Sequence, residues 1–270
     1  MQKIKTDYDS FEALNYSLAK ELLTSPKGLV YNDKGDEEEK NKEKKQFTIG
    51  KAVHCLILEP ENFPDYFLVT DKNLATKEGK QDKEYAEAMN LSILKQKDYE
   101  VIQIMVSEVL KNKNFKILLE NKTHTELKLF RELPPIMETN KLPEFMPTIK
   151  GRLDLLTNTS HKCSDIKTIQ AGIIKEDNLL KWHIKKYMYH LQAVFYNLLL
   201  GIDNPADMRY TLMFVESKAP YQTRLVELSF DWFIDGLILF KQAAKLYQIY
   251  VTEGAENVPG YELEDIILNF

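Results

Sequence analysis

Two carboxylates and a lysine lie close together in the middle of the chain: Asp154, and then Asp165 and Lys167 in an Asp-Ile-Lys triplet. Facing carboxylates repel unless a cation lies between them, and Mg²⁺ or Mn²⁺ suits such a site because these hard ions prefer carboxylate oxygen. A nearby lysine can orient or deprotonate a water, or stabilise charge on a phosphate. These residue types indicate metal-dependent phosphodiester hydrolysis. The alternative is a solvated strand surface, since such a triplet is expected about once by chance at this charged content.

The three residues can act together only if two strands pair as a hairpin. Residues 151–157 and 163–169 alternate apolar with polar side chains, as half-buried strands do, and residues 158–161 between them are typical of a turn. A turn centred in this segment pairs Asp154 with Asp165, with Cβ atoms about 5 Å apart. The lysine two residues beyond Asp165 shares their face. The side chains expected to point into the core are Leu153, Leu155 and Ile166.

Upstream of the hairpin, the sequence predicts two helices separated by a charged segment. The first helix has Ser17 as its N-cap and ends at Pro26. Residues 33–45 carry no apolar side chain, so we expect a solvated, mobile loop. The second helix, within residues 47–63, places His54 on a mostly buried face. A histidine there is more often a core residue than a metal ligand, although neutral imidazole can be one.

A long helix and a strand then lead to the hairpin. The helix is expected over residues 82–111, and the strand, over 124–131, carries Glu126. The proline-rich segment that follows this strand is expected to be an irregular link. With strands at 148–157 and 162–169, the sequence predicts a three-stranded meander with acids on one surface.

Downstream of the hairpin, the sequence predicts one long helix over residues 181–200, ended by Gly201. Gln192 and Tyr196 are four residues apart and therefore share a face of this helix. A basic cluster begins the helix: Lys181, His183, Lys185 and Lys186. Two antiparallel strands (209–215 and 221–230), a helix capped by Asp231 that runs to about residue 251, and a peripheral tail beyond residue 254 complete the chain.

The composition is that of an ordinary globular protein: 270 residues, 29% charged and 44% hydrophobic, with a net charge of −5. This charge does not exclude DNA, because a nuclease needs local rather than global positive charge. The two cysteines are far apart, which favours a reduced, cytoplasmic compartment. We expect no secretory signal and no membrane segment. No internal repeat or long linker divides the chain, so a single domain over residues 1–270 is expected.

The order of these features is more specific than any one of them. Asp154, a hairpin, Asp165-Ile-Lys167 and then a helix with Gln192 and Tyr196 resembles the PD-(D/E)XK nuclease superfamily. The Gln-x-x-x-Tyr helix and the upstream histidine resemble its RecB-like branch. The chain is most similar to the RecE-type, lambda-exonuclease-like enzymes of phages and prophages. The segments that carry this similarity are Gly50…His54…Leu-Glu-Pro-Glu-Asn-Phe63, Ser164-Asp-Ile-Lys-Thr168, Tyr189-His-Leu-Gln-Ala-Val-Phe-Tyr196 and Ser17…Pro26.

The resemblance spans about residues 15–240 and implies an α/β (α+β type) fold with a restriction-endonuclease-like core, in which helices flank a mixed central β-sheet. It also implies roles for the matching positions. One or two Mg²⁺ ions, replaceable by Mn²⁺, would be held by His54, Asp154, Asp165 and the backbone carbonyl of Ile166. Lys167 would position the attacking water. Gln192 and Tyr196 would organise the DNA strand near the scissile phosphate.

The resemblance implies further site residues and two departures. Glu126 matches an acidic residue on the preceding strand of related exonucleases. The positions that would contact DNA are Ser17, Lys185, Lys186 and Tyr189. Asp165 stands where many members carry glutamate, and Met188 stands where a basic residue is expected, for which Lys185 and Lys186 would substitute.

The resemblance also implies a substrate and partners. Members of the family degrade one strand of linear double-stranded DNA from the 5′ end and leave a 3′ overhang for a single-strand annealing protein of the RecT/Red-beta kind. They close into homo-oligomeric rings, trimers in the lambda type and tetramers in the RecE type. A phage- or prophage-encoded protein in the bacterial cytoplasm is therefore expected. This chain is much shorter than full-length RecE and resembles only its nuclease part.

Two alternatives remain open at the level of sequence. One is a RecB- or Cas4-like nuclease of other polarity, or an endonuclease. The other is a catalytically idle module that binds DNA or a recombination partner. Retention of Asp154, Asp165 and Lys167 disfavours the idle module, because such a protein has no need of all three.

Overall fold

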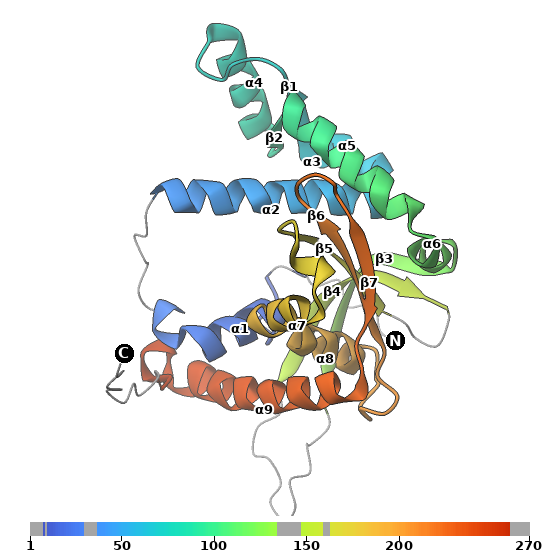
Figure 1. The fold of residues 1–270 in the computed structure, drawn as a ribbon. Helices are drawn as coiled ribbons and strands as arrows, with labels where there is room; N and C mark the ends of the chain where they lie inside the picture. Colours follow the sequence, from blue (N-terminus) through green and yellow to red (C-terminus); the bar gives the residue numbers. More distant parts are fainter. Residues whose placement is uncertain (1–7, 9, 30–36, 134–146, 159–162, 260–270) are drawn as a thin grey trace, which may run out of the picture.

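A mixed five-stranded sheet forms the centre of the protein (Figure 1). The computed structural model describes residues 8, 10–29, 37–133, 147–158 and 163–259. The strand order is β3-β4-β5-β6-β7; β5 and β6 are parallel and the other neighbours are antiparallel. The strands are β3 (Lys122–Glu132), β4 (Thr148–Thr157), β5 (Cys163–Ile169), β6 (Tyr210–Glu216) and β7 (Thr223–Glu227). The predicted fold class, the three-stranded meander and the later antiparallel pair are confirmed.

Helices cover the two faces of this sheet (Figure 1). One face packs against α1 (Tyr16–Thr24), α7 (Asp177–Lys186), α8 (Tyr189–Leu199) and α9 (Phe230–Glu253). The other packs against α2 (Glu37–Leu58), α5 (Gln96–Lys111) and α6 (Lys113–Glu120). Short 3₁₀ turns lie at Pro26–Leu29, Pro60–Asn62, Ile173–Lys175 and Ala255–Asn257. Each face therefore has its own hydrophobic core, and the sheet lies between the two.

An arm beyond α2 contains structure that the sequence did not reveal (Figure 1). It comprises α3 (Phe63–Tyr66), α4 (Lys77–Ala88) and a parallel pair of strands, β1 (Phe67–Thr70) and β2 (Ser92–Lys95). The prediction of one helix over residues 82–111 is wrong, because the chain leaves α4 through Asn90, whose φ is 54°, and pairs as β2 before α5 begins. Leu94 explains the interruption, since it is buried in the core beside α5.

The charged segment before His54 is helical and not a loop. Residues 30–36 lie outside the described part, but α2 begins at Glu37 and continues to Leu58. Glutamate and lysine are strong helix formers. The prediction of a loop over residues 33–45 is therefore wrong from Glu37 onward. The end of the helix before Pro60 is confirmed.

Two helix starts differ from the predictions. Asn15, not Ser17, is the N-cap of α1, because its side-chain oxygen accepts the Leu18 N–H at 2.9 Å. Helix α9 begins after Ser229, so Asp231 lies in its first turn and is not its cap. Both predictions selected a suitable residue type two residues too late.

The predicted helix over residues 181–200 is two helices. The break lies at Tyr187 and Met188, and Met188 adopts left-handed backbone with φ 55° and ψ 36°. Gly201, with φ 84°, follows the end of α8 as expected. The tail is also more embedded than predicted, because Val258 belongs to the core. Residues from 260 onward lie outside the described part.

The hairpin has the predicted register. Leu155 pairs with Ser164 and Leu156 with Cys163, so the next positions outward are Asp154 and Asp165. The side chains of Leu153, Leu155 and Ile166 are buried as expected. Most of the turn predicted at residues 158–161, and most of the irregular link predicted from residue 134 to Pro147, lie outside the described residues.

A glycine at the contact of α8 with α9 provides a test of the packing. A Cβ at Gly236 would lie 2.5 Å from the His190 carbonyl oxygen and 2.8 Å from Val194 Cγ2. Gly236→Ala is therefore expected to destabilise the protein by about 1–3 kcal/mol, because backbone must move. Thermal or urea unfolding measures this change. The matched control is Gly50→Ala in α2, where the nearest atom would be Thr168 Oγ1 at 3.5 Å; equal destabilisation by both would contradict the packing argument.

Candidate active site

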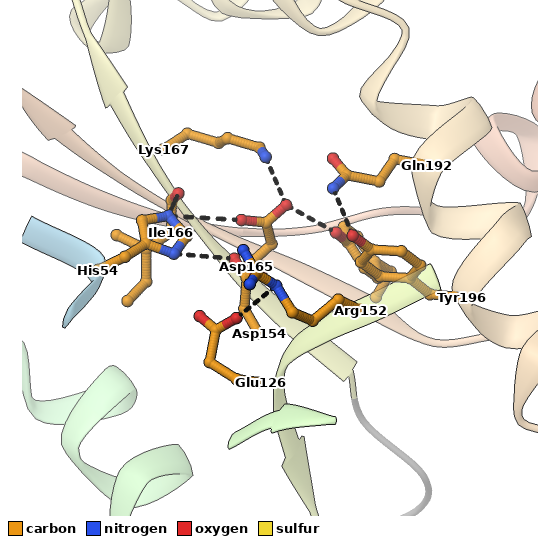
Figure 2. A network of polar contacts seen from close by, with 10 residues as sticks. His54, Glu126, Arg152, Asp154, Asp165, Ile166, Lys167, Gln192 and Tyr196 are labelled. Carbon is orange, nitrogen blue, oxygen red and sulfur yellow. Dashed lines mark hydrogen bonds and ion pairs between the residues drawn. The ribbon is translucent and has the colours of Figure 1, made fainter. Parts of the chain in front are cut away.

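Helix α2 and the hairpin bring three metal-ligating side chains together (Figure 2). His54 Nδ1 lies 3.2 Å from Asp154 Oδ2, and His54 Nε2 lies 3.8 Å from Asp165 Oδ1. The backbone oxygen of Ile166 contacts His54 Nε2 from the adjacent strand position. One ligand atom from each side chain lies within 4.8 Å of the others. The four groups named as metal ligands from the sequence are thus adjacent in space.

The donor set fits a hard divalent cation. Asp154 is 8% exposed and Asp165 is fully buried. Asp154 Oδ2 and Asp165 Oδ1 have no hydrogen-bond partner among the described residues. Buried carboxylate oxygens without partners are costly in a folded protein. Two such oxygens beside an imidazole and a carbonyl oxygen form a cluster that a divalent ion would satisfy.

The second oxygen of Asp165 is already occupied. Lys167 Nζ lies 2.5 Å from Asp165 Oδ2, and the Tyr210 hydroxyl donates to the same atom at 3.0 Å. Burial would raise the pKa of Asp165, but the charge of Lys167 and the other polar contacts of this carboxylate together lower that pKa. Burial would lower the pKa of Lys167, but the two aspartates raise it. Asp165 is therefore held ionised, with Oδ1 directed to the ligand cluster and Oδ2 fixed by donors.

Asp154 behaves in the opposite way. Burial and then the charge of Asp165 raise its pKa well above the ordinary aspartate value. Burial also lowers the pKa of His54, which favours the neutral imidazole that a metal requires. Without an ion, the site therefore favours a protonated Asp154 beside an ionised Asp165, and a cation would favour ionisation of both carboxyl groups.

Helix α8 contributes a buried pair beside the carboxylates (Figure 2). Gln192 Nε2 donates to the Tyr196 hydroxyl at 2.9 Å. Burial raises the pKa of Tyr196 well above its usual value, so the phenol keeps its proton. The close approach of α8 to β4 requires Gly151, since a Cβ there would lie 2.6 Å from Leu199 Cδ1 and 3.3 Å from Tyr196 Cε1.

Glu126 lies at the edge of the site and not in the ligand cluster. Its backbone is left-handed, with φ 49°, and its carboxylate forms an ion pair with Arg152 Nε at 2.8 Å. The His54, Asp154 and Asp165 cluster does not include it. Arg152, whose side chain is 55% exposed, is the guanidinium seen beside the carboxylates in Figure 2.

The residues predicted to contact DNA are distributed on α1, α7 and α8. Ser17 is exposed on α1, and Lys185 and Lys186 are exposed in the last turn of α7. Lys185 Nζ also lies 3.9 Å from Asp235. Tyr189 is directly linked to the site, because Lys167 Nζ lies 5.0 Å from the centre of its ring. Among these four, Tyr189 is the residue whose side chain contacts Lys167, the partner of Asp165.

Two site residues were not found from the sequence. Arg152 lies two positions before Asp154 on the same strand. Residues two apart in a strand share a face, so this spacing predicts that Arg152 lies beside the site. Tyr210 lies on β6, which pairs in parallel with β5 and places Tyr210 opposite Cys163. About forty residues separate these strands in the sequence, so no local pattern gives that register.

Removal of the imidazole is expected to weaken metal binding. His54→Ala leaves the two carboxylates and the Ile166 carbonyl in place, so we expect activity to persist only at about tenfold or more higher Mg²⁺. Titration of hydrolysis against Mg²⁺ concentration measures this shift. Cys55→Ala, on the same helix but outside the cluster, is the matched control. An unchanged Mg²⁺ requirement in His54→Ala would exclude the imidazole as a ligand.

Most of the chain matches one known protein family. Residues 15–261 match the family described as "PDDEXK-like domain of unknown function (DUF3799)". Among curated proteins, none matches the chain. No described helix has the length and apolar character needed to cross a bilayer.

Solved structures also match the chain, among them two crystal structures. The crystal structure of a "Putative exonuclease" from Eubacterium rectale has a TM-score of 0.59 at 11% identity, covering 99% of this chain and 97% of that one. This similarity shows a shared fold. The crystal structure of SSO0001 has a TM-score of 0.31 at 17% identity, covering 75% of this chain and 86% of that one. Because the family model matches residues 15–261, the chain belongs to the PDDEXK-like family. The prediction of a metal-dependent nuclease is confirmed.

Proposed function

We propose that the protein is a Mg²⁺-dependent exonuclease that degrades one strand of linear double-stranded DNA from 5′ to 3′ and leaves 3′ overhangs. The observation that carries this proposal is the convergence of His54, Asp154, Asp165 and the Ile166 carbonyl beside Lys167. The similarity to a structure described as an exonuclease supports the exonuclease reading. The 5′ polarity follows from the sequence resemblance to RecE-type enzymes.

Different residues of the site would have different roles in hydrolysis. His54, Asp154, Asp165 and the Ile166 carbonyl would hold the ion. A divalent ion bound there would lower the pKa of a water and offset negative charge on the phosphoryl oxygens. Lys167, fixed by Asp165 Oδ2, is placed to orient the attacking water or contact a phosphate oxygen.

Helix α8 and the neighbouring arginine would position the substrate. Tyr196 accepts a hydrogen bond from Gln192, so its own proton is free to be donated to a phosphate oxygen. Arg152 is half-exposed, and its guanidinium can exchange Glu126 for a phosphate. Glu126 would then set the orientation of Arg152 and not bind the metal directly.

We also propose that the chain acts as one domain in a ring of three or four copies around duplex DNA. The overhang would be passed to a single-strand annealing protein, as in the enzymes that the sequence resembles. Size-exclusion chromatography with light scattering tests the ring: a monomer at working concentrations would exclude it.

Strand-specific digestion tests the activity. A linear duplex with distinct labels at its 5′ and 3′ ends, incubated with Mg²⁺, is expected to release 5′ nucleotides progressively and leave the 3′-labelled strand. Mn²⁺ should substitute, and EDTA should stop the reaction. Covalently closed circular DNA is the control. Nicking of the circle would indicate an endonuclease, and release from the 3′ end would indicate the opposite polarity.

A further inference from the structure

Three aromatic side chains lie on α7 and at the break between α7 and α8. Trp182 is 57% exposed and Tyr187 is 37% exposed, and Tyr189 is half-buried between them and the sheet. The rings of Tyr187 and Tyr189 are stacked, with centroids 5.9 Å apart and planes 18° apart. We call Trp182, Tyr187 and Tyr189 the aromatic ledge. The proposed hydrolysis does not need the two exposed rings.

Lysines surround the exposed end of the aromatic ledge. Lys186 Nζ lies 4.8 Å from the centre of the Trp182 ring and 5.7 Å from that of Tyr187. Lys20, on α1, lies 5.2 Å from the Tyr187 ring. Neither lysine forms an ion pair with a described carboxylate. Two ammonium groups over rings, without a carboxylate, form a surface of local positive charge in an acidic protein.

The buried end of the aromatic ledge reaches the carboxylates. Lys167 Nζ lies 5.0 Å from the Tyr189 ring and 2.5 Å from Asp165 Oδ2. Contacts therefore lead from the exposed Trp182 ring, across Lys186, to the two stacked tyrosines and on to the site of hydrolysis. An extended molecule that follows it would present successive groups to successive rings.

The backbone is adapted to this arrangement. In a continuous helix, residues two apart do not face each other, so Tyr187 and Tyr189 stack only because Met188 is left-handed. Such a conformation is unfavourable for a residue with a side chain. It is held in place by Tyr16, whose hydroxyl donates to the Tyr187 carbonyl at 2.5 Å. The fold thus tolerates local strain at the position that aligns the rings.

We propose that the aromatic ledge stacks unpaired bases of a single DNA strand and so guides a frayed strand end to the carboxylates. Rings give base-independent stacking, and neighbouring lysines contact the phosphates, which is the chemistry of single-strand binding. The inference rests on the proposed nuclease function but adds a separate binding surface. It explains why the exposed rings lie next to lysines and not in a core.

Tryptophan fluorescence measures this binding directly, because the protein has two tryptophans, Trp182 and Trp232. A Trp232→Phe protein reports on the aromatic ledge alone, and a Trp182→Phe protein is the matched control. In EDTA, where no cleavage occurs, a 12-nucleotide oligo(dT) is expected to quench the first strongly and the second weakly. Stacking predicts that Trp182→Ala lowers oligo(dT) affinity about tenfold or more, with Trp182→Phe restoring most of it.

Substitution by leucine separates stacking from general apolar contact. Trp182→Leu should bind oligo(dT) as poorly as Trp182→Ala, since it has no π face. In Mg²⁺, Trp182→Ala should raise KM for a blunt linear duplex and leave kcat nearly unchanged. Tyr85→Ala, an exposed aromatic on α4, should change neither.

The outcomes separate this inference from the proposed function. Unquenched Trp182 emission together with unchanged affinity in Trp182→Ala would overturn the aromatic ledge, even if the wild type hydrolyses DNA. Equal binding by the leucine and phenylalanine variants would indicate an apolar protein-docking surface instead and would also overturn it. If the wild type binds oligo(dT) at Trp182 but never hydrolyses DNA, the nuclease proposal fails and the binding surface stands.

Discussion

Asp165→Ala is expected to reduce DNA hydrolysis by about 10³-fold or more while the protein remains folded. Asp165 supplies one free oxygen to the ligand cluster and holds Lys167 with the other, so the substitution removes a ligand and frees the lysine. A metal ion held at such a site stabilises the charge of the transition state by several kcal/mol. Each 1.36 kcal/mol of that stabilisation is a factor of ten in rate. Single-turnover digestion of an end-labelled duplex measures the loss.

The same variant separates binding from chemistry. Loss of a negative charge next to the phosphates should leave DNA binding intact or tighten it, which a gel-shift or anisotropy titration in Ca²⁺ measures. Asp203→Ala is the matched control, because Asp203 is half-exposed and pairs with Arg131. Wild-type cleavage by Asp165→Ala would refute the assignment of the site. Unfolding of that variant, seen by circular dichroism, would direct the test to Asp165→Asn, which keeps the side-chain shape.

The core of the site could be predicted because it depends on local patterns. Strand alternation and a short turn fix which residues pair in a hairpin, so Asp154 and Asp165 followed from the sequence. The spacing of four on a helix likewise placed Gln192 next to Tyr196, and the two side chains are hydrogen-bonded. Those inferences needed no information about distant parts of the chain.

The rest of the site depends on contacts between distant segments. Tyr210 holds Asp165 from a parallel strand, and parallel pairing is set by the crossover rather than by a turn. The αL position of Met188 was equally hidden, because methionine is a good helix former and the surrounding apolar pattern is helical. Tertiary packing, here including the hydrogen bond from Tyr16, overrides the local preference.

The errors in the fold have a common physical origin. The lack of apolar side chains in residues 37–45 predicts a loop, but these residues extend a helix whose later turns are packed. Once Ala52 and Val53 anchor α2 in the core, adding turns of good helix formers is favourable, since propagation costs less than nucleation. The composition of a segment indicates whether it is stable as a helix by itself. It does not indicate whether a neighbouring helix that is packed in the core will extend into the segment.

Asp154→Asn is expected to have opposite effects on stability and on activity. In the metal-free protein, Asp154 is buried next to ionised Asp165, and its Oδ2 has no hydrogen-bond donor among the described residues. At a pH above its raised pKa, where Asp154 is charged, removing that charge should raise the free energy of unfolding by about 1–3 kcal/mol. For a chain of this size, each kcal/mol corresponds to a rise in Tm of about 2–4 °C. The same change removes a metal ligand, so hydrolysis should be lost.

The pH dependence follows from the sign of the shift. Burial and the Asp165 charge raise the pKa of Asp154 in the folded protein. An acid whose pKa is raised on folding contributes stability below its unfolded pKa, and this contribution is lost as pH rises through the folded value. Without metal, wild-type stability should therefore decline as pH rises above the ordinary aspartate range near 4. The Asp154→Asn protein should lack this part of the decline.

Mg²⁺ should raise the Tm of the wild type above that of Asp154→Asn and so reverse their order. An ion that binds only the folded state raises the wild-type Tm with its concentration, whereas Asp154→Asn, lacking a ligand, should respond weakly. Thermal unfolding in EDTA and in a Mg²⁺ series, at pH 5 and pH 8, measures all of these effects. Asp203→Asn should behave as the wild type does. A lower Tm of Asp154→Asn than of the wild type in EDTA at pH 8 would contradict the repulsion between the two buried carboxylates. An undiminished response of its Tm to Mg²⁺ would contradict the role of Asp154 as a metal ligand.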